Sequence, residues 1–255
     1  MRTKFADVKG VVMTTSENDT ITATPGSAAW WLGRDTDKQP SRQRADGITV
    51  RRILDAALEV LEDEGADALT MRRVADRLGT GAASLYRHVA SREELVVLLV
   101  DHVIGLPRTN AAAPASADWR ARLTRTARNL RAHLLQHRAV VPLITAAQML
   151  GPSTMRGREA VLRYLVADGF DPATAIRVHM TVWHFTVATV QLDARHGART
   201  AGEREVLREL FADQEAKGLP LVAEHADLFA AHDSDTEFEF GLAALLAGFE
   251  HLRTP

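Results

Sequence analysis

The sequence predicts an all-α fold with two helical domains, and three observations support this prediction. From Ile48 onward, apolar residues recur at helical spacing almost everywhere, and no stretch alternates apolar and polar residues over a useful length. An Ala-, Pro- and Ser-rich segment at residues 109–117 interrupts the helical pattern and is the natural domain boundary. The chain has 255 residues, of which 46% are hydrophobic, so each domain can bury a core.

The composition excludes several classes of site. The chain contains no cysteine, which excludes disulfides, a thiol nucleophile and cysteine-based zinc or iron–sulfur sites. The formal net charge is −2, so nucleic-acid binding would need a local basic patch. The longest aliphatic run, Leu95–Val100, is too short to cross a bilayer, and no apolar segment of a secretory signal follows the charged N-terminal residues. We therefore expect a soluble cytoplasmic protein that does not enter a membrane.

Residues 1–45 differ in composition from the rest of the chain. Small polar residues dominate there without an apolar period, and only Trp30 and Trp31 interrupt them. Lys38, Arg42 and Arg44 make the last part of this segment basic. The sequence predicts a flexible basic N-terminal arm that could follow the phosphates of DNA or enter a minor groove, as homeodomain arms do. The alternative is a tail whose charges only keep it soluble.

Four helices are predicted in the first domain, residues 46–107. Their expected ranges are 49–64, 70–78, 82–89 and 91–106. Thr70 is a suitable N-cap for the second helix, and Gly79 ends that helix and permits a tight turn. Ser91 and Glu94 have the spacing of a capping box at the start of the fourth helix.

Residues 70–89 fit a helix-turn-helix, because two short helices are joined by a glycine turn and a longer helix precedes them. In the third helix, Leu85 and Val89 would face the core. The outward residues would be Ala82, Ala83, Ser84, Tyr86, Arg87 and His88. Small residues at its start would let this helix approach the major groove, and Ser84 and Arg87 can bind base edges or phosphates.

Three arginines flank the expected reading helix. Arg72 and Arg73, near the start of the second helix, and Arg92, after the third, could bind backbone phosphates. The alternative is that these helices only contribute to the hydrophobic core and bind no DNA, because glycine turns between amphipathic helices are common in all-helical proteins. The acidic residues of this domain cluster at residues 59–67, away from the reading helix, which favours DNA binding.

Three segments of the first domain carry a resemblance to a known family. Leu69-Thr-Met-Arg-Arg-Val-Ala-Asp-Arg-Leu-Gly79, Ser84-Leu-Tyr-Arg-His-Val89 and Arg92-Glu-Glu-Leu95 resemble the tetracycline-repressor (TetR) family of transcriptional regulators. In the second domain, Trp183-His-Phe-Thr186 and Phe238-Glu-Phe-Gly-Leu242 look like segments of the C-terminal domain of the tetracycline-repressor subgroup.

The resemblance implies an N-terminal three-helix helix-turn-helix DNA-binding domain and a C-terminal helical ligand-binding and dimerisation domain. It also implies a homodimer that binds a palindromic operator in double-stranded DNA and releases it when a small-molecule effector binds. By position, the DNA contacts of the family fall on Arg72, Ala82, Ala83, Ser84, Tyr86, Arg87, His88 and Arg92. Arg42 and Arg44 are added as contacts that the arm could make.

In the second domain, residues 118–255, helices are expected at 118–137, before Gly169, and at 172–196, 203–215 and 236–252. The helix at 172–196 is apolar on nearly all sides, which indicates burial on all sides. The last helix carries a stripe of small residues, Gly241, Ala244 and Gly248. Two such helices from each protomer would form a four-helix dimer interface, and the alternative is an ordinary monomer core.

An effector pocket is indicated by polar groups on core-facing stripes. Thr126, His133 and His137 lie on the stripe of the helix from Asp118, and Ile176, His179 and Trp183 share a face of the later helix. An alternative that fits about as well is that these polar residues belong to the core and make their hydrogen bonds within the protein. Residues of the family's pocket, mapped by position, fall near Thr126, Leu130, Gln148, His179 and Trp183.

No metal and no cofactor is expected. His133 and His137 have a spacing that can bind zinc, but no third ligand is evident nearby, and a chance pair is the preferred interpretation. Tetracycline-binding relatives bind the drug with magnesium through a histidine shortly after the first long helix of this domain. Residues 139–149 contain no histidine, which argues against tetracycline and against a metal.

The sequence therefore predicts a ligand-responsive DNA-binding regulator, a repressor and not an enzyme. One alternative is an enzyme on a helical scaffold, although the chain has no G-x-S-x-G motif, no H-E-x-x-H motif and no phosphate loop. A second alternative is a constitutive DNA-binding protein without a dedicated inducer.

Overall fold

A computed structural model of the chain describes residues 13–15, 19–21, 23–34, 48–106, 117–196 and 199–253. The regular secondary structure of these residues is helical apart from one short antiparallel pair, in which β1 (Met13–Thr15) pairs with β2 (Asp19–Ile21). The all-α prediction is confirmed, and the two strands were missed because three residues are too few to show an alternating pattern. The chain divides into two compact units, residues 1–108 with 137–160 and residues 109–136 with 161–255.

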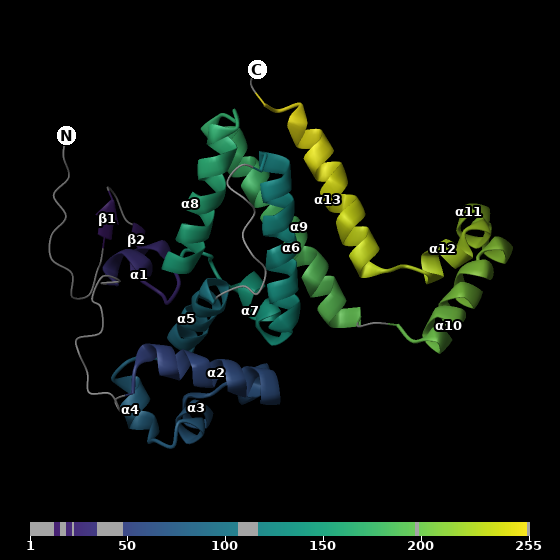
Figure 1. The fold of residues 1–255 in the computed structure, drawn as a ribbon. Helices are drawn as coiled ribbons and strands as arrows, with labels where there is room; N and C mark the ends of the chain where they lie inside the picture. The colour runs from purple at the N-terminus through teal and green to yellow at the C-terminus, as the bar shows by residue number, and fades with distance from the viewer. Residues whose placement is uncertain are drawn as a thin grey trace. The chain divides into compact units, whose positions relative to one another are not determined.

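The first unit contains the helices of the predicted DNA-binding domain (Figure 1). They are α1 (Ala28–Gly33), α2 (Val50–Glu64), the 3-10 helix η1 (Ala66–Ala68), α3 (Met71–Arg77), α4 (Ala82–Tyr86) and α5 (Arg92–Gly105). It also includes the 3-10 helix η2 (Arg138–Val140), α7 (Val141–Ala146) and the first part of α8 (Pro152–Ala167). Helix α2 packs on α3 and α5, and α3 packs on α4.

Side-chain caps explain where three of these helices begin. The hydroxyls of Thr49, Thr70 and Ser91 accept hydrogen bonds from backbone N–H groups at the starts of α2, α3 and α5, at 3.1–3.2 Å. Each such cap contributes about 1 kcal/mol to helix stability. The expected capping box at α5 forms only in part, because Oε2 of Glu94 accepts from the backbone N–H of Ala90, at 2.8 Å, rather than from that of Ser91.

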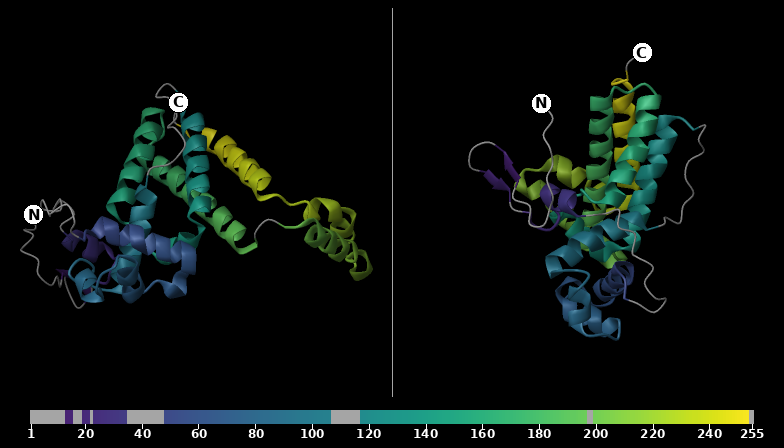
Figure 2. Two further views of the ribbon diagram at one scale, coloured as in Figure 1. Left: turned by 60° about the horizontal axis from the view of Figure 1, so that its bottom comes forward. Right: turned by 90° about the vertical axis from the view of Figure 1, so that its left-hand side faces the viewer.

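The second unit is built around the long helix α9 (Pro172–His196), on which α6 (Trp119–Gln136) and α13 (Ser234–Glu250) both pack (Figures 1 and 2). Between α9 and α13 lie α10 (Ala201–Ala212), the 3-10 helix η3 (Glu215–Lys217), α11 (Pro220–Glu224) and α12 (Ala226–Ala230). Helix α10 packs on α11 and α12, so these helices form a small group of their own.

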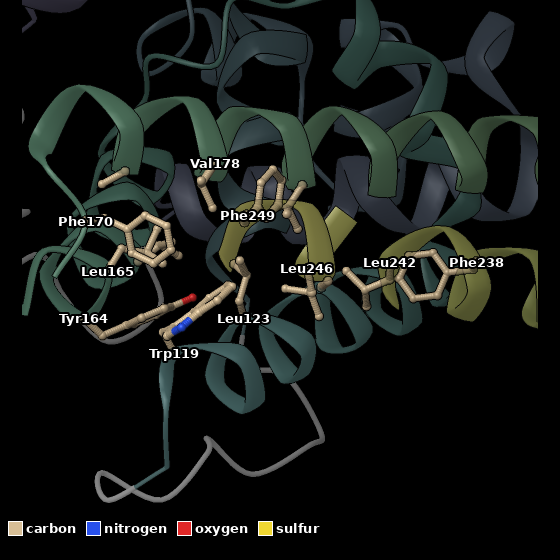
Figure 3. Packing of buried hydrophobic residues seen from close by; sticks show 14 residues of the cluster. Trp119, Leu123, Tyr164, Leu165, Phe170, Val178, Phe238, Leu242, Leu246 and Phe249 are labelled. Carbon is tan, nitrogen blue, oxygen red and sulfur yellow. The ribbon is translucent and has the colours of Figure 1, made fainter. Parts of the chain in front are cut away.

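Aromatic and aliphatic side chains fill the core of the second unit (Figure 3). Trp119 of α6 meets Phe170 edge to face, with ring centroids 5.0 Å apart, and Phe185 of α9 stacks on Phe238 of α13 at 5.5 Å. The labelled residues of this cluster are Trp119, Leu123, Tyr164, Leu165, Phe170, Val178, Phe238, Leu242, Leu246 and Phe249. The cluster ties α6, the second part of α8, α9 and α13 together.

Three predictions need correction. Residues 23–34, expected to belong to the flexible arm, fold into a turn and the helix α1. The segment 198–235 was expected to hold one helix at 203–215, but α10 ends at Ala212 and the short helices α11 and α12 follow. Helix α7 was not predicted. Helices this short show too few turns for an apolar period, and packing decides whether they form.

None of the helices in the described residues is both long and apolar enough to cross a membrane.

Candidate DNA-binding surface and effector site

The turn before α4 is built on a glycine in the left-handed conformation. Gly79 has φ of +65°, a conformation that side chains with a Cβ rarely adopt. The backbone N–H of Thr80 donates to the carbonyl of Ala75 at 3.0 Å, and that of Gly79 donates to Asp76 at 3.1 Å. These two bonds form a Schellman motif, which ends α3 and fixes the direction in which α4 leaves it.

Helix α4 has the orientation that the sequence predicts. Leu85 and Val89 are fully buried, whereas Tyr86 is 53% exposed. Ala83 and Arg87 are also exposed, and Ala82, Ser84 and His88 are partly exposed. Nη2 of Arg87 donates to Oγ of Ser84 at 3.1 Å, so the two polar groups expected to read DNA already contact each other. The outward face of α4 is available for a groove of DNA.

The arginines of α3 have different partners. The guanidinium of Arg73 donates to Glu64 of α2 at 2.6 Å, and this hydrogen bond holds the pKa of Glu64 below its ordinary value. Arg77 bonds three acidic residues of α2, Glu59, Asp63 and Glu64, at 2.9–3.3 Å. Arg72 is exposed, and no hydrogen bond or ion pair joins it to another described residue. Of these three cations, Arg72 is therefore the one that a phosphate could bind without competition from α2.

Arg92 has a structural partner that the sequence did not reveal. Its Nε donates to the carbonyl of Leu69 at 2.7 Å, and its Nη2 donates to the carbonyl of Ala66 at 3.2 Å. The side chain therefore ties the start of α5 to the η1–α3 connection. A contact of Arg92 with phosphate stays a prediction, and only its remaining N–H groups could make it. Arg42 and Arg44 lie outside the described residues.

Four of the predicted effector residues lie on two packed helices of the second unit. Leu130 of α6 is buried, and Thr126 of α6 and His179 and Trp183 of α9 are partly buried. The hydroxyl of Thr126 donates to the carbonyl of Arg122 at 2.9 Å. Ile176 was expected to share the inward face of His179 and Trp183, but it is 50% exposed. Gln148 lies in the first unit, after α7.

Tyr164 of α8 is a candidate site residue that the sequence did not indicate. Its hydroxyl is buried and makes no hydrogen bond of normal geometry with another described residue, although the Thr126 hydroxyl lies close enough to interact with it weakly. Burial raises the pKa of Tyr164 to about 12, so its hydroxyl remains a donor at neutral pH. A buried donor without a strong acceptor can bind a ligand oxygen at little cost. The side chain lies beside Trp119 (Figure 3).

His133 of α6 and His137, which follows α6, do not share a metal site among the described residues. His133 is buried, whereas Nδ1 of His137 lies 2.6 Å from Oε1 of Glu62 of α2. In the described part of the chain, no three His, Asp or Glu side chains form a group that could hold a metal ion.

Helices α9 and α13 each carry large apolar side chains that are exposed in the protomer. On α9, Ile176 and Leu192 are 50% and 54% exposed, and on α13 Phe240 is 73% exposed. The small residues of α13 separate into two groups. A Cβ added at Gly241 would lie 2.6 Å from the ring of Phe185, whereas one added at Gly248 would meet no atom within 4 Å. Gly241 therefore faces the core of its own chain, and Gly248 faces outward.

Comparisons with known proteins identify the family. Residues 53–99 match the family described as "Bacterial regulatory proteins, tetR family", and residues 112–253 match "Tetracyclin repressor-like, C-terminal domain". The class A tetracycline repressor from transposon 1721 of Escherichia coli is 33% identical over 201 residues, which cover 79% of this chain and 90% of the relative. The repressor DrrR1 of Streptomyces coeruleorubidus is 33% identical over 226 residues, covering 86% and 83%.

Solved structures agree with this assignment. Crystalline ActR from Streptomyces coelicolor, described as a TetR family protein in complex with actinorhodin, is 30% identical and has a TM-score of 0.72. The match covers 81% of this chain and 97% of ActR. From its matches over both the reading helices and the C-terminal helices, the chain belongs to the TetR family of bacterial regulatory proteins.

Proposed function

We propose that this protein is a dimeric transcriptional repressor that binds a palindromic operator through α4 and releases it when a small molecule binds between α6 and α9. The observation that carries the proposal is the exposed face of α4, which rests on the buried Leu85 and Val89. A regulator of this kind acts on chromosomal DNA, which supports a cytoplasmic location. The acidic side chains of α2 hold Arg73 and Arg77, so Arg72 is the cation of α3 that we assign to a phosphate.

Relatives support a small-molecule effector. One solved relative is ActR in complex with actinorhodin, and another is a TetR variant from Acinetobacter baumannii in complex with minocycline, 28% identical with a TM-score of 0.60. In this chain, Thr126, His179, Trp183 and the buried hydroxyl of Tyr164 supply a few polar groups among aromatic and aliphatic residues. Such a set of groups suits the binding of an organic molecule with several oxygen atoms. We assign the protein no catalytic role, because the polar groups of α6 and α9 fit binding and orientation.

The proposal is tested with the full chain and DNA from upstream of its own gene. Fluorescence anisotropy should show saturable binding that unlabelled specific DNA, but not unrelated DNA, competes away. Actinorhodin, minocycline and tetracycline should then be titrated into the complex, and at least one effector of this kind should release it. Coupling of about 1–3 kcal/mol is expected between effector and operator. Specific binding that no compound changes would support a constitutive DNA-binding protein, and the absence of specific binding would refute the repressor.

The reading helix should account for much of the operator affinity. Tyr86→Ala and Arg87→Ala are each expected to weaken operator binding by about 1–3 kcal/mol without changing helical content, because both side chains are exposed at the C-terminal end of α4. Arg156→Ala is a matched control, since Arg156 of α8 contacts Ser153 at 3.1 Å in the same way as Arg87 contacts Ser84. Wild-type affinity in both α4 variants, measured by anisotropy, would refute the docking of this helix.

The basic arm should contribute to the salt dependence of binding. The double variant Arg42→Ser with Arg44→Ser should flatten the slope of log affinity against log salt by about 0.9 for each phosphate contact that is lost. Substitution is preferable to removing residues 1–45, because that truncation would also remove α1. The same slope in wild type and variant would assign the arm no role at the phosphates.

A further inference from the structure

Residues 23–34, named here the N-terminal clamp, form an ordered element outside both segments that match the family, residues 53–99 and 112–253. The backbone N–H of Ser27 donates to the carbonyl of Thr24 at 3.0 Å, and Gly26 in this turn has φ of +87°. Oγ of Ser27 then caps α1 by accepting from the N–H of Trp30 at 3.2 Å. The clamp thus has its own turn, cap and helix, which a passive tail would not need.

A buried carboxylate joins the clamp to the connection between α4 and α5. Glu94 of α5 is 7% exposed, and one of its oxygens accepts a hydrogen bond from the guanidinium of Arg34 at the end of the clamp. Its other oxygen accepts from the backbone N–H of Ala90 at 2.8 Å. Ala90 directly follows Val89, the fully buried residue that anchors the end of the reading segment. Because a buried carboxylate is costly without a charged partner, Arg34 stabilises the corner between α4 and α5.

The clamp also meets the side of α5, but it does not pack there completely. A Cβ at Gly26 would lie 2.9 Å from Cγ2 of Val97, so the turn approaches α5 closely. Beside this contact, a cavity of about 310 Å³ remains between the turn, α5 and the end of α7, and Gln148 is among its lining residues. Incomplete packing makes the contact weaker than a core contact, and weak contacts open more readily than the core does.

Helix α5 connects this contact to another part of the first unit. Near its C-terminal end, the carboxylate of Asp101 accepts from the backbone N–H groups of Ser153 and Thr154, both at 3.1 Å, and so caps the start of α8. The same helix therefore binds the clamp and the α4–α5 corner at one end and the start of α8 at the other. A group that fixes one end of such a helix can bias its position.

We propose that the N-terminal clamp is a positioning element that, when docked on α5, holds α4 in the orientation that binds DNA. This inference rests on the proposed function. Arg34 acts through Glu94 and the α4–α5 corner, and the buried Ala29 helps to hold α1 in place. Undocking of the clamp lowers operator affinity, and it leaves the salt dependence of binding unchanged because the clamp itself contacts no phosphate.

The test uses point variants of the full chain. Arg34→Ala removes the partner of Glu94, and Ala29→Glu places a charge at a position that is 7% exposed. Each should lower operator affinity at least about 10-fold with an unchanged salt slope, because Arg34→Ala loses a charge-assisted hydrogen bond and Ala29→Glu loses a buried contact. Leu32→Ser is the matched control, because Leu32 lies on the same helix and is 77% exposed. Arg34→Lys should restore part of the affinity, because an ammonium can still pair with Glu94.

Docking is measured separately in the free protein. Trp30 and Trp31 are two of the four tryptophans, and the indole nitrogen of Trp31 is buried, so undocking should shift tryptophan emission to longer wavelength. Trypsin should also cut after Arg34 faster in the Ala29→Glu protein than in the Leu32→Ser protein. If a variant undocked in these assays but bound the operator with wild-type affinity, the inference would be overturned. It would also be overturned if Arg34→Ala changed neither the docking signals nor the operator affinity. If wild type bound no operator while its docking signals were normal, the proposed function itself would have failed.

Discussion

Arg131→Leu is expected to destabilise the protein by about 3–5 kcal/mol, because it removes one partner of a buried ion pair. Arg131 of α6 is 9% exposed. Its guanidinium donates to Asp193 of α9 at 2.8 Å and to Asp235 of α13 at 2.5 Å. It also lies over the ring of Phe238, with Cζ 5.0 Å from the centroid. One side chain therefore joins the three helices that pack together in the second unit.

The cost arises mainly at Asp193, whose side chain is 15% exposed and would lose its cation. Asp235 is 77% exposed and can be hydrated instead. Urea unfolding at fixed protein concentration measures the effect, since the stability of a dimer depends on concentration. The matched control is Arg128→Leu on the same helix. Arg128 makes two hydrogen bonds to Glu239 at 2.6–2.7 Å, but both side chains are about half exposed, so a loss of no more than about 1 kcal/mol is expected. Equal losses in the two variants would contradict this account.

The local structure of the DNA-binding domain could be predicted from the sequence, because the residues that start, end and orient its helices lie within a few positions of one another. Thr70 caps the helix that starts at the next residue, and Gly79 ends that helix through its own φ. The four-residue spacing of Leu85 and Val89 determines which face of α4 is buried, and both residues are fully buried as predicted. Each of these features depends on a backbone conformation or a helical period that the sequence itself displays.

Contacts between distant segments could not be predicted in the same way. Arg131 lies 62 residues from Asp193 and 104 residues from Asp235, and no local pattern connects them. Glu94 was expected to complete a capping box, but its oxygens bond Ala90 and Arg34, the latter 60 residues away. Arg92 was likewise expected to bind phosphate, but its guanidinium donates to the backbone carbonyls of Leu69 and Ala66. Such partners are set by packing, and single-sequence patterns do not contain that information.

Gly248→Trp is expected to abolish the dimer at micromolar concentration. Gly248 lies on the exposed side of α13, and no atom of its own chain lies within 4 Å of a Cβ built there. An indole can therefore be accommodated in the protomer, whereas a partner helix that crosses α13 closely would be displaced. Gly241 is a poorer probe, because its Cβ would clash with Phe185 inside the protomer. Sedimentation velocity should show a two-fold species for wild type and a monomer for the variant, with equal helical content by circular dichroism.

Gly157→Trp is the matched control for this experiment. Gly157 of α8 is also exposed, with no atom within 4 Å of its added Cβ, so the same bulk at that position should leave the dimer intact. The two variants should differ in DNA binding as well, because a palindromic operator needs two copies of α4 at a fixed spacing. A monomer contacts only one half-site and loses the effective concentration that links the two, so Gly248→Trp should bind the operator at least about 100-fold more weakly. A wild-type monomer would contradict the dimer, and a dimeric Gly248→Trp protein would exclude α13 from a close crossing.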